Sequence, residues 1–389
     1  MKKIILSVPG SKSLTNRAIV MASLSNGLSK ISNISNSLDS QIMIKAMKKL
    51  GVKIEQVKNQ LQIIGNQGVF PKFIGKIDVG NAGTAARFLT ALCCLVPGRV
   101  VFNKSRRMRE RPIKELIEAL KKIRTGKISI KGNISSQFIS SLLMIAPTLN
   151  KGLTINISGQ KISSSYIDMT IDLMKKFGVE VKKIGDDKYV IKKQLYRQTN
   201  YLVESDLSGA SYFFAAAAIT GKTIKIKNVN PKSVQGDRFF PDLLERMGCQ
   251  VRKNIKEKWI EVKGPKILRG ITVDMVNMPD TAQTLAVVAA FAKGKTKITG
   301  LSTLKIKETN RLLALKNELD KMGIKSQTTN SSITIYGGNP KKAVIETYGD
   351  HRMAMAFAVA KLRIPELIIK NPEVVKKSFP EFWEKWRQI

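Results

Sequence analysis

The sequence predicts a mixed α/β protein that is assembled from one repeated unit. An apolar helix rich in small residues, a turn and a short β-run recur six times along the chain. The turns fall at Gly27, Gly98, Gly152, Gly221, Gly294 and Pro365, with successive spacings of 71, 54, 69, 73 and 71 residues, so four of the five spacings are almost equal. Self-similarity at a fixed period is the signature of one supersecondary unit that is used several times.

A second kind of helix lies between the apolar ones and completes each repeat. It is charged, and it ends before a predicted β-hairpin at Gly51, Gly178, Gly248 and Gly323. Glycine suits the left-handed residue that ends a helix, and the alternation of KWIEVKG over 258–264 is typical of a half-buried strand. We therefore expect six repeated βαβαββ units in an α/β fold.

The second repeat is predicted to be truncated. Its segment LIEALKKIRTGKISIKG, residues 116–132, keeps a helix and one strand but lacks the glycine turn and the first hairpin strand. This loss accounts for the short spacing of 54 residues, and we expect it to lower the stability of the fold rather than to affect its chemistry.

Length and composition indicate a globular protein of two domains. The chain has 389 residues and is 43% hydrophobic, which suits two packed cores rather than a disordered chain. No apolar run reaches the ~18 residues of a membrane span, and the start does not read as a signal peptide. The three cysteines, Cys93, Cys94 and Cys249, follow no disulfide or metal pattern. We therefore expect a cytoplasmic protein with reduced thiols and no membrane contact.

The formal net charge of +38 admits two interpretations. A basic surface can be the electrostatic footprint of nucleic-acid binding. However, the lysines are spread along the chain, and no RNA-binding aromatic signature or helix-turn-helix pattern accompanies them. We favour the second interpretation, in which dispersed surface lysines help to attract small anionic substrates, so a nucleic-acid partner is not expected.

Polar clusters precede the apolar helices, and each is a potential anion site because helix N-termini present free N–H groups. In PGSKSLTNR, residues 9–17, Ser11 and Ser13 can cap the helix while Lys12 and Arg17 supply cations. An anion site and an ordinary serine-capped helix explain this segment equally well. GNAGTAAR, residues 80–87, is a glycine-rich helix entry without the spacing of a phosphate-binding Walker loop.

Four further motifs carry charged side chains. Arg106 is followed by three more arginines in RMRERPIKEL. Such a run of charge usually forms a solvated face, unless an anion binds there. In KIKETNR, Lys307 and Arg311 are four residues apart on a helix, an unfavourable like-charge pair that suggests an anionic partner. GDHRMAMAF holds the only histidine, His351, which is either a proton-exchanging group or an exposed residue at a helix start. Asp280 in MPDTAQT is either an N-cap or a base, and no segment matches zinc, Walker-loop or Ser-His-Asp chemistry.

Taken in order, these motifs resemble those of the EPSP synthases, the 3-phosphoshikimate 1-carboxyvinyltransferases. The resemblance covers nearly the whole chain, through PGSKSLTNRA, GNAGTAAR, RMRERPI, SSQF, SYIDMT, ESDLSGASYFFAAAA, QGDRF, PDTAQT, KIKETNR, GDHRMAM and KSFPEFW. It implies a two-lobed enolpyruvyl transferase-like fold with three repeats in each lobe and the active site in the cleft between them. The first lobe is expected to comprise 1–11 and 206–389, and the second lobe 12–205.

The resemblance also implies a reaction. The 5-hydroxyl of shikimate 3-phosphate adds to phosphoenolpyruvate, and the tetrahedral intermediate then loses phosphate to give the enolpyruvyl ether on the route to chorismate and the aromatic amino acids. This chemistry needs cations for the phosphates and carboxylates together with proton-transfer groups. It implies no metal and no organic cofactor, and the family is commonly monomeric.

Site residues are implied motif by motif. Proton transfer falls to Asp280 and Glu308, with Lys12 assisting and His351 supporting, and which carboxylate serves which atom stays open. Phosphoenolpyruvate is expected to contact Lys12, Gly83, Arg111, Gln137, Arg311, Arg352 and Lys377. Shikimate 3-phosphate is expected to contact Ser13, Arg17, Ser135, Ser136, Gln137, Ser163, Asp280 and Lys307, with Tyr166 beside them.

Some positions depart from the family pattern. Thr303 stands where asparagine usually lies near the substrate phosphate, Asn310 replaces an aspartate, and Phe88 replaces a common proline. The family is the target of glyphosate, which Gly83 leaves room to bind, with Phe88 altering the strength. The alternatives are the sister enzyme that acts on UDP-N-acetylglucosamine, a basic RNA-binding protein and a non-catalytic relic. The absence of a loop cysteine argues against the first, and the intact site residues argue against the last.

Overall fold

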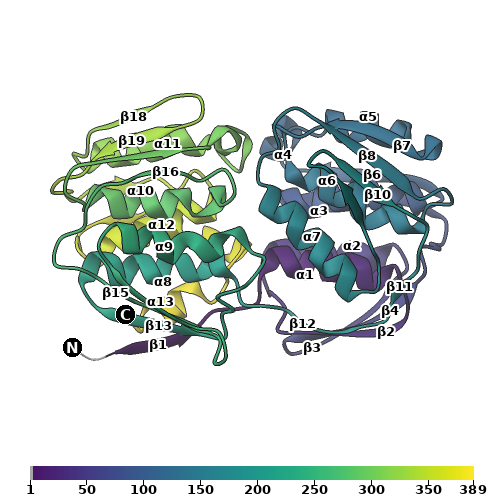
Figure 1. Cartoon of the computed structure of the whole chain (residues 1–389), viewed down its shortest axis with the longest axis horizontal. Coiled ribbons are helices and arrows are strands. Elements are labelled where there is room, and N and C mark those ends of the chain that lie inside the picture. Colours follow the sequence, from purple (N-terminus) through teal and green to yellow (C-terminus); the bar gives the residue numbers. More distant parts are fainter. Residues whose placement is uncertain (1–2) are drawn as a thin grey trace. The chain divides into compact units, whose positions relative to one another are not determined.

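A computed structural model describes residues 3–389, which form two compact units (Figure 1). Unit 1 comprises the chain up to Pro9 together with Glu204–Ile389, and unit 2 is the continuous segment Gly10–Val203. Both units mix helices and sheets, so the predicted α/β class is confirmed. None of the helices in the described part of the chain is long and apolar enough to cross a membrane.

Among the described residues, unit 1 has two four-stranded sheets, called complete here, and one sheet of two short strands. The strands are β1 (Ile4–Ser7), β13 (Thr223–Lys227), β15 (Trp259–Lys263) and β14 (Gln250–Asn254) in the first sheet, β16 (Thr272–Asp274), β17 (Lys295–Thr299), β19 (Ile333–Tyr336) and β18 (Ser326–Thr328) in the second, and β20 (Val344–Ile345) with β21 (Ile368–Ile369) in the third. Each complete sheet joins a parallel pair to an antiparallel hairpin, as in β1–β13 and β15–β14.

Three apolar helices that pack against one another form the core of unit 1. The helices of this unit are α8 (Leu207–Thr220), α9 (Phe240–Arg246), α10 (Ala282–Ala290), α11 (Arg311–Lys321), α12 (His351–Lys361) and α13 (Phe382–Trp386). Almost every residue of α8, α10 and α12 is buried, and many of them are alanine, which lets neighbouring helices approach closely. This all-round burial explains why these segments read as apolar runs without an amphipathic stripe.

Unit 2 follows the same plan. Its strands are β2 (Ser25–Ser32), β4 (Gln60–Asn66), β3 (Lys53–Val57), β11 (Tyr196–Arg197) and β12 (Asn200–Leu202) in one sheet, β5 (Phe73–Gly80) with β6 (Gly98–Lys104) in another, and β7 (Lys127–Lys131), β8 (Leu153–Ser158), β10 (Lys188–Ile191) and β9 (Lys182–Ile184) in a third. Its helices are α1 (Lys12–Ser23), α2 (Leu38–Lys49), α3 (Gly83–Leu92), α4 (Arg106–Glu110), α5 (Lys114–Lys121), α6 (Ser136–Ile145) and α7 (Ser164–Lys176).

Short 3₁₀ turns carry several site residues and extend some helices. They span Cys93–Leu95, Ile123–Thr125 and Ala146–Thr148 in unit 2, and Gly236–Phe239, Pro279–Thr281, Ser302–Ile306 and Pro372–Lys377 in unit 1. The four glycines predicted to end the charged helices all have positive φ, between 74° and 107°, so that prediction is confirmed.

The prediction for the second repeat was wrong in two respects. Lys127–Lys131 was expected to be the one strand left of this repeat's hairpin. Instead, this strand pairs in parallel with β8 and forms the edge of the third sheet. The turn glycine is also present, since Gly126 has a φ of 77°. Among the described residues, β5 and β6 therefore form a sheet of two parallel strands with no hairpin, and no residue of β6 is buried.

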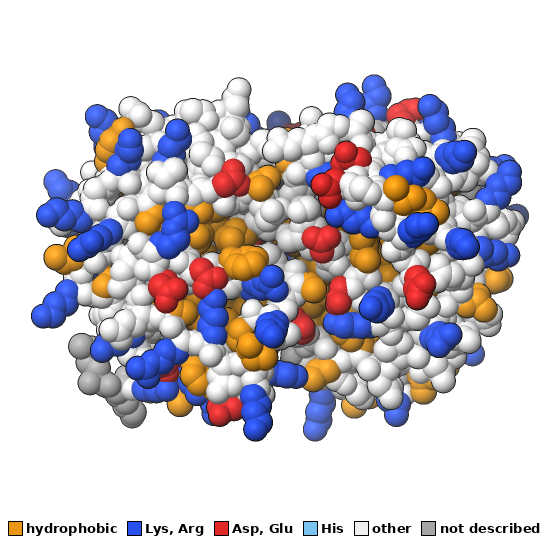
Figure 2. All heavy atoms as spheres, in the orientation of Figure 1, with side chains coloured by type: hydrophobic (Ala, Val, Ile, Leu, Met, Phe, Trp, Pro, Cys, Tyr) orange, Lys and Arg blue, Asp and Glu red, His pale blue; other side chains and the backbone are white. Residues whose placement is uncertain are grey.

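Basic side chains are dispersed over the surface. In Figure 2, Lys and Arg lie scattered over the visible face with Asp and Glu between them, rather than in one continuous basic patch. This distribution agrees with a lysine-rich composition.

Candidate active site

A buried guanidinium organises the charged residues of unit 1. Arg311 is 1% exposed and opens α11, whose N-terminus is capped by the Asn310 side chain. Its Nε donates to Asp350 Oδ2 at 2.7 Å, and its Nη2 donates to Glu308 Oε2 at 2.8 Å. Its Nη1 reaches Asp280 Oδ1 at 3.2 Å. Lys307 lies before α11, which begins at Arg311, so the prediction that these two cations share a helical turn was wrong. The charge of Arg311 is balanced by Glu308 of the same motif and by Asp280 and Asp350 from other elements.

Asp280 is the carboxylate on which three cations converge. It lies in the 3₁₀ turn Pro279–Thr281, directly before α10. Arg352 Nη2 donates to its Oδ2 at 2.9 Å, and Lys307 Nζ lies 3.5 Å from its Oδ1. Burial would raise the pKa of Asp280, but the positive charges of Arg352, Lys307 and Arg311 outweigh burial and hold the pKa well below its ordinary value. Asp280 is therefore an ionised carboxylate here.

The remaining predicted residues of unit 1 join the same network. Lys377 Nζ lies 3.6 Å from Glu308 Oε1. His351 is 1% exposed, with Nδ1 3.5 Å from Asp350 Oδ1, so the alternative of an exposed histidine at a helix start was wrong. Asp350 caps α12 by accepting the Arg352 N–H at 2.9 Å, which fixes both neighbours.

A fourth carboxylate, Asp237, lies in the QGDRF motif, and its sequence context predicts no role for it. It is 5% exposed, and its Oδ2 accepts a hydrogen bond from the Ser208 hydroxyl. Burial and the nearby negative charge of Asp280 raise the pKa of Asp237 to about 7, against the opposing effects of Ser208 and Arg352. The local sequence gives no sign of this burial, because the side chains that enclose Asp237 come from other elements.

Unit 2 places its predicted residues at the N-termini of apolar helices. Lys12 opens α1, and its Nζ pairs with Asp39 Oδ2 at 3.0 Å. The expected serine cap was wrong, since Ser11 occupies the N-cap position but its side chain accepts no capping hydrogen bond. The first-turn N–H groups of α1 are therefore not capped by a side chain, and a cation lies beside them.

A second group in unit 2 surrounds the start of α3. The Arg111 guanidinium lies so close to Gly83 that a Cβ there would be 2.6 Å from Nη2 and 2.8 Å from Cζ. Arg111 is 6% exposed, whereas Arg106 and Arg109 are exposed, so the arginine run divides into one buried cation and a solvated face. Gln137 Nε2 donates to the hydroxyl of Thr84, at 3.1 Å, which links the starts of α6 and α3.

The serines and Arg17 form the third group. Ser135 caps α6 by accepting the Gln137 N–H at 3.2 Å, and Ser163 precedes α7 with a φ of 54°. Helices α6 and α7 pack together, so Ser136 and Ser163 start neighbouring helices. Arg17 donates to the carbonyls of Ser13 and Tyr166.

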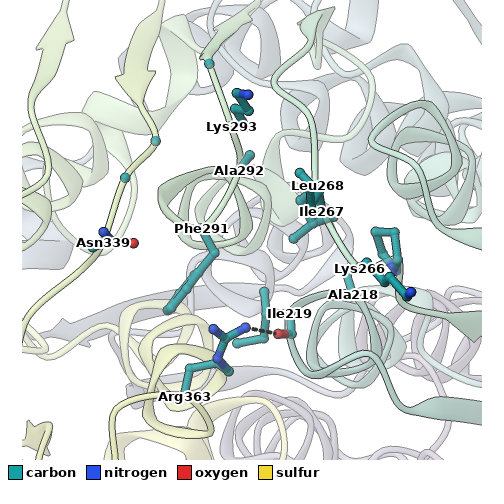
Figure 3. Close-up of a pocket in the computed structure, with 14 residues that line it drawn as sticks. Ala218, Ile219, Lys266, Ile267, Leu268, Phe291, Ala292, Lys293, Asn339 and Arg363 are labelled. Carbon is teal, nitrogen blue, oxygen red and sulfur yellow. Dashed lines mark hydrogen bonds between the residues drawn. The ribbon is translucent and has the colours of Figure 1, made fainter.

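A hollow of about 350 Å³ in unit 1 lies away from all these residues (Figure 3). It is lined by Ile219, Phe291 and Arg363, which follow or end α8, α10 and α12, whereas the site residues Ser208, Asp280 and Arg352 lie at the starts of the same helices. Arg363 Nη1 donates to the Ile219 carbonyl at 2.8 Å. The basic residues at this end complement helix C-terminal carbonyls, and the labelled lysines do not converge on one point.

The sequence model of the family described as EPSP synthase (3-phosphoshikimate 1-carboxyvinyltransferase) matches residues 2–386. The 3-phosphoshikimate 1-carboxyvinyltransferase of Nostoc punctiforme is 39% identical over 409 aligned positions, which cover 99% of this chain and 96% of that protein. The Marinomonas protein of the same name is 39% identical, with 99% and 96% coverage. Because this chain has 389 residues, at least 20 of the 409 positions fall opposite gaps in it.

Solved structures give the same result. An EPSP synthase structure from Acinetobacter baumannii superimposes with a TM-score of 0.81 at 25% sequence identity, covering 99% of this chain and 95% of that one.

Proposed function

The chain belongs to the EPSP synthase family and transfers the enolpyruvyl group of phosphoenolpyruvate to shikimate 3-phosphate in the shikimate pathway, and from this premise we propose which of its residues perform that reaction. The carboxylate–guanidinium network of unit 1 and the helix N-termini of unit 2 act on the same two substrates. Both substrates are anions, and both groups of residues supply cations at helix starts.

The convergence of three cations on Asp280 is the observation that carries the proposal. In the free protein, Arg311, Arg352 and Lys307 share this one carboxylate, whose side chain is 16% exposed. A substrate carboxylate that binds the two guanidinium groups in bidentate fashion supplies a competing negative charge. The attraction that lowers the pKa of Asp280 then weakens, so substrate binding turns an inert ion-paired carboxylate into a group that can accept a proton.

Glu308 is the partner of Asp280 in proton transfer. In the addition step, the substrate hydroxyl loses a proton as its oxygen bonds to the enol carbon, and the methylene carbon gains a proton. In the elimination step, the C–O bond to phosphate breaks and the new methyl group loses a proton. Two carboxylates bound to the same guanidinium, at 2.8 and 3.2 Å, are placed to share these transfers, with Lys12 assisting and His351 supporting through Asp350.

The other assignments follow the same chemistry. We propose that phosphoenolpyruvate is held by Lys12, Gly83, Arg111, Gln137, Arg311, Arg352 and Lys377. We propose that shikimate 3-phosphate is held by Ser13, Arg17, Ser135, Ser136, Gln137, Ser163, Asp280 and Lys307. A cytosolic monomer is proposed as the working form, and the three free thiols support a reducing compartment.

Phosphate release by the purified protein tests the assignment of Asp280. We expect release only when both substrates are present, and Asp280→Asn to reduce the rate by about 10²- to 10⁴-fold. Asp242→Asn is the matched control, because its side chain is 36% exposed and pairs with Lys253 on the surface. Equal rates in Asp280→Asn and the control would remove Asp280 from the mechanism. Dependence on UDP-N-acetylglucosamine instead of shikimate 3-phosphate would identify the sister activity.

A further inference from the structure

Arg17 is a buried cation whose hydrogen-bond partners are all neutral. It is 1% exposed, and no carboxylate in the described part of the chain forms an ion pair with it. Its Nε donates to the Thr170 hydroxyl at 2.7 Å, and its Nη2 donates to the Ser140 hydroxyl and the Tyr166 carbonyl, each at 3.2 Å. Burial lowers the pKa of Arg17 to about 10.

One N–H of this guanidinium is available to a ligand. A guanidinium carries five N–H groups, and four of them have the acceptors just named or the Ser13 carbonyl, which Nη1 reaches at 2.9 Å. The second N–H of Nη1 has no acceptor among residues 3–389. A substrate that contacts Arg17 would therefore accept a hydrogen bond from Nη1. The direction of that N–H depends on how firmly the other contacts hold the guanidinium in place.

No carboxylate pairs with Arg17 among the described residues, but the ring of Phe88 presents an electron-rich face to its guanidinium. Phe88 is 1% exposed, and its ring centroid lies 5.2 Å from Arg17 Cζ. A cation within about 6 Å of a ring centroid is attracted by the ring quadrupole, and the attraction grows when both groups are removed from water. Phe88 belongs to α3, whose first residue is Gly83, and Arg17 belongs to α1.

We propose that Phe88 is a positioning residue for shikimate 3-phosphate, which it affects by holding the Arg17 guanidinium through a cation–π contact. The inference rests on the proposed function, in which Arg17 contacts that substrate. Phe88 also ties the helix that opens at Gly83, beside Arg111, to the helix that carries Lys12 and Arg17. A ring at this position is thus a determinant of substrate affinity as well as part of the core.

The competing explanation is that Phe88 only fills space. Replacing it with leucine removes the ring and some volume, so loss of stability alone does not separate the two explanations. Phe177→Leu is the matched control, because Phe177 is also fully buried in unit 2 but packs on Tyr196 and Tyr201 rather than on a guanidinium. We expect both variants to unfold more easily.

Substrate binding separates them. We expect Phe88→Leu to raise the dissociation constant of shikimate 3-phosphate by roughly 3- to 30-fold. The KM for phosphoenolpyruvate should stay within about twofold of its original value, and Phe177→Leu should change neither constant. Equal effects of the two variants on shikimate 3-phosphate would overturn the proposal.

A fluorination series provides the stricter measurement, because it changes the ring quadrupole with little change in volume. Phenylalanine, 4-fluorophenylalanine and 3,4,5-trifluorophenylalanine at position 88 should bind shikimate 3-phosphate progressively more weakly. A flat series in a folded protein would refute the cation–π role. Arg17→Ala distinguishes the two levels of failure. If it leaves binding intact, the proposed contact of Arg17 is wrong, whereas if it abolishes binding while the series stays flat, only the inference about Phe88 fails.

Discussion

Single residues show which site features a sequence can reveal. The four-residue spacing of Lys307 and Arg311 predicted a shared helical turn, which was wrong because α11 begins at Arg311, but the anionic partner that it suggested is present as three carboxylates around Arg311. The spacing did not indicate that these would be Asp280, Glu308 and Asp350. Asp237 was missed because burial is a property of the assembled fold, and its short motif looks like an ordinary turn. The order of the motifs was enough to select most of the candidate residues. Their partners and their burial depend on tertiary contacts, which the motifs do not encode.

Gly83 permits the close approach of Arg111. A methyl group at this position would lie 2.6–2.8 Å from the guanidinium, so Gly83→Ala must displace that side chain. We expect the KM for phosphoenolpyruvate to rise between about 10- and 100-fold, since small displacements of a binding cation have large effects. Steady-state kinetics test this, with Gly338→Ala as the control because the nearest atom there is 3.8 Å away. An unchanged KM in Gly83→Ala would show that Arg111 does not bind that substrate.

Asp237 should make folding depend on pH. Its pKa is about 7 in the folded protein, whereas an aspartate in an unfolded chain has a pKa near 3.9. As the pH rises from about 4 to 7, the unfolded chain releases a proton that the folded protein keeps, so this residue lowers the free energy of unfolding. Asp237→Asn removes that effect. As the pH rises from about 4 to 7, the free energy of unfolding of the variant should therefore increase by roughly 1–3 kcal/mol relative to that of the original protein. Denaturant unfolding at several pH values measures it, and parallel curves would contradict the raised pKa.

Elements were predicted best where the signal was local. The small-residue helices and the glycines that end the charged helices follow from side-chain size and backbone conformation, and both are present. Strand pairing is not local. The period-two pattern of Lys127–Lys131 fits any edge strand, so the sequence could not show that it pairs with β8 rather than with a hairpin of its own repeat.

The sheet of β5 and β6 should be the most easily opened in unit 2. Its β6 pairs only with β5 in the part of the chain described here, and no β6 residue is buried, whereas β13 in unit 1 pairs on both sides and buries Ile224 and Ile226. We expect the amides of β6 that bond to β5 to exchange hydrogen at least about tenfold faster than those of β13. Exchange followed by mass spectrometry or NMR tests this, and equal protection would show that the open edge of β6 is covered.

At the scale of the whole molecule, the missing hairpin should lower stability without abolishing activity. The charged residues proposed for catalysis lie outside the truncated segment, which removes packing but no catalytic group. We expect a thermal midpoint on the order of 5–10 °C below that of the Nostoc punctiforme relative under the same buffer. Calorimetry of both proteins tests this, and a higher midpoint for this chain would contradict it.

Unit 2 interrupts unit 1 in the chain, and this has a consequence for synthesis. Strand β1 pairs with β13, in the register Ile4 to Ile224 and Leu6 to Ile226, yet all of Gly10–Val203 is translated between them. At about 5–20 residues per second, roughly 10–40 s pass before β13 emerges from the ribosome. By the end of that interval unit 2 has been translated in full and is free to fold, whereas β1 has had no β13 to pair with throughout. Delayed docking of β1 makes this early segment the part of unit 1 most exposed to chaperones.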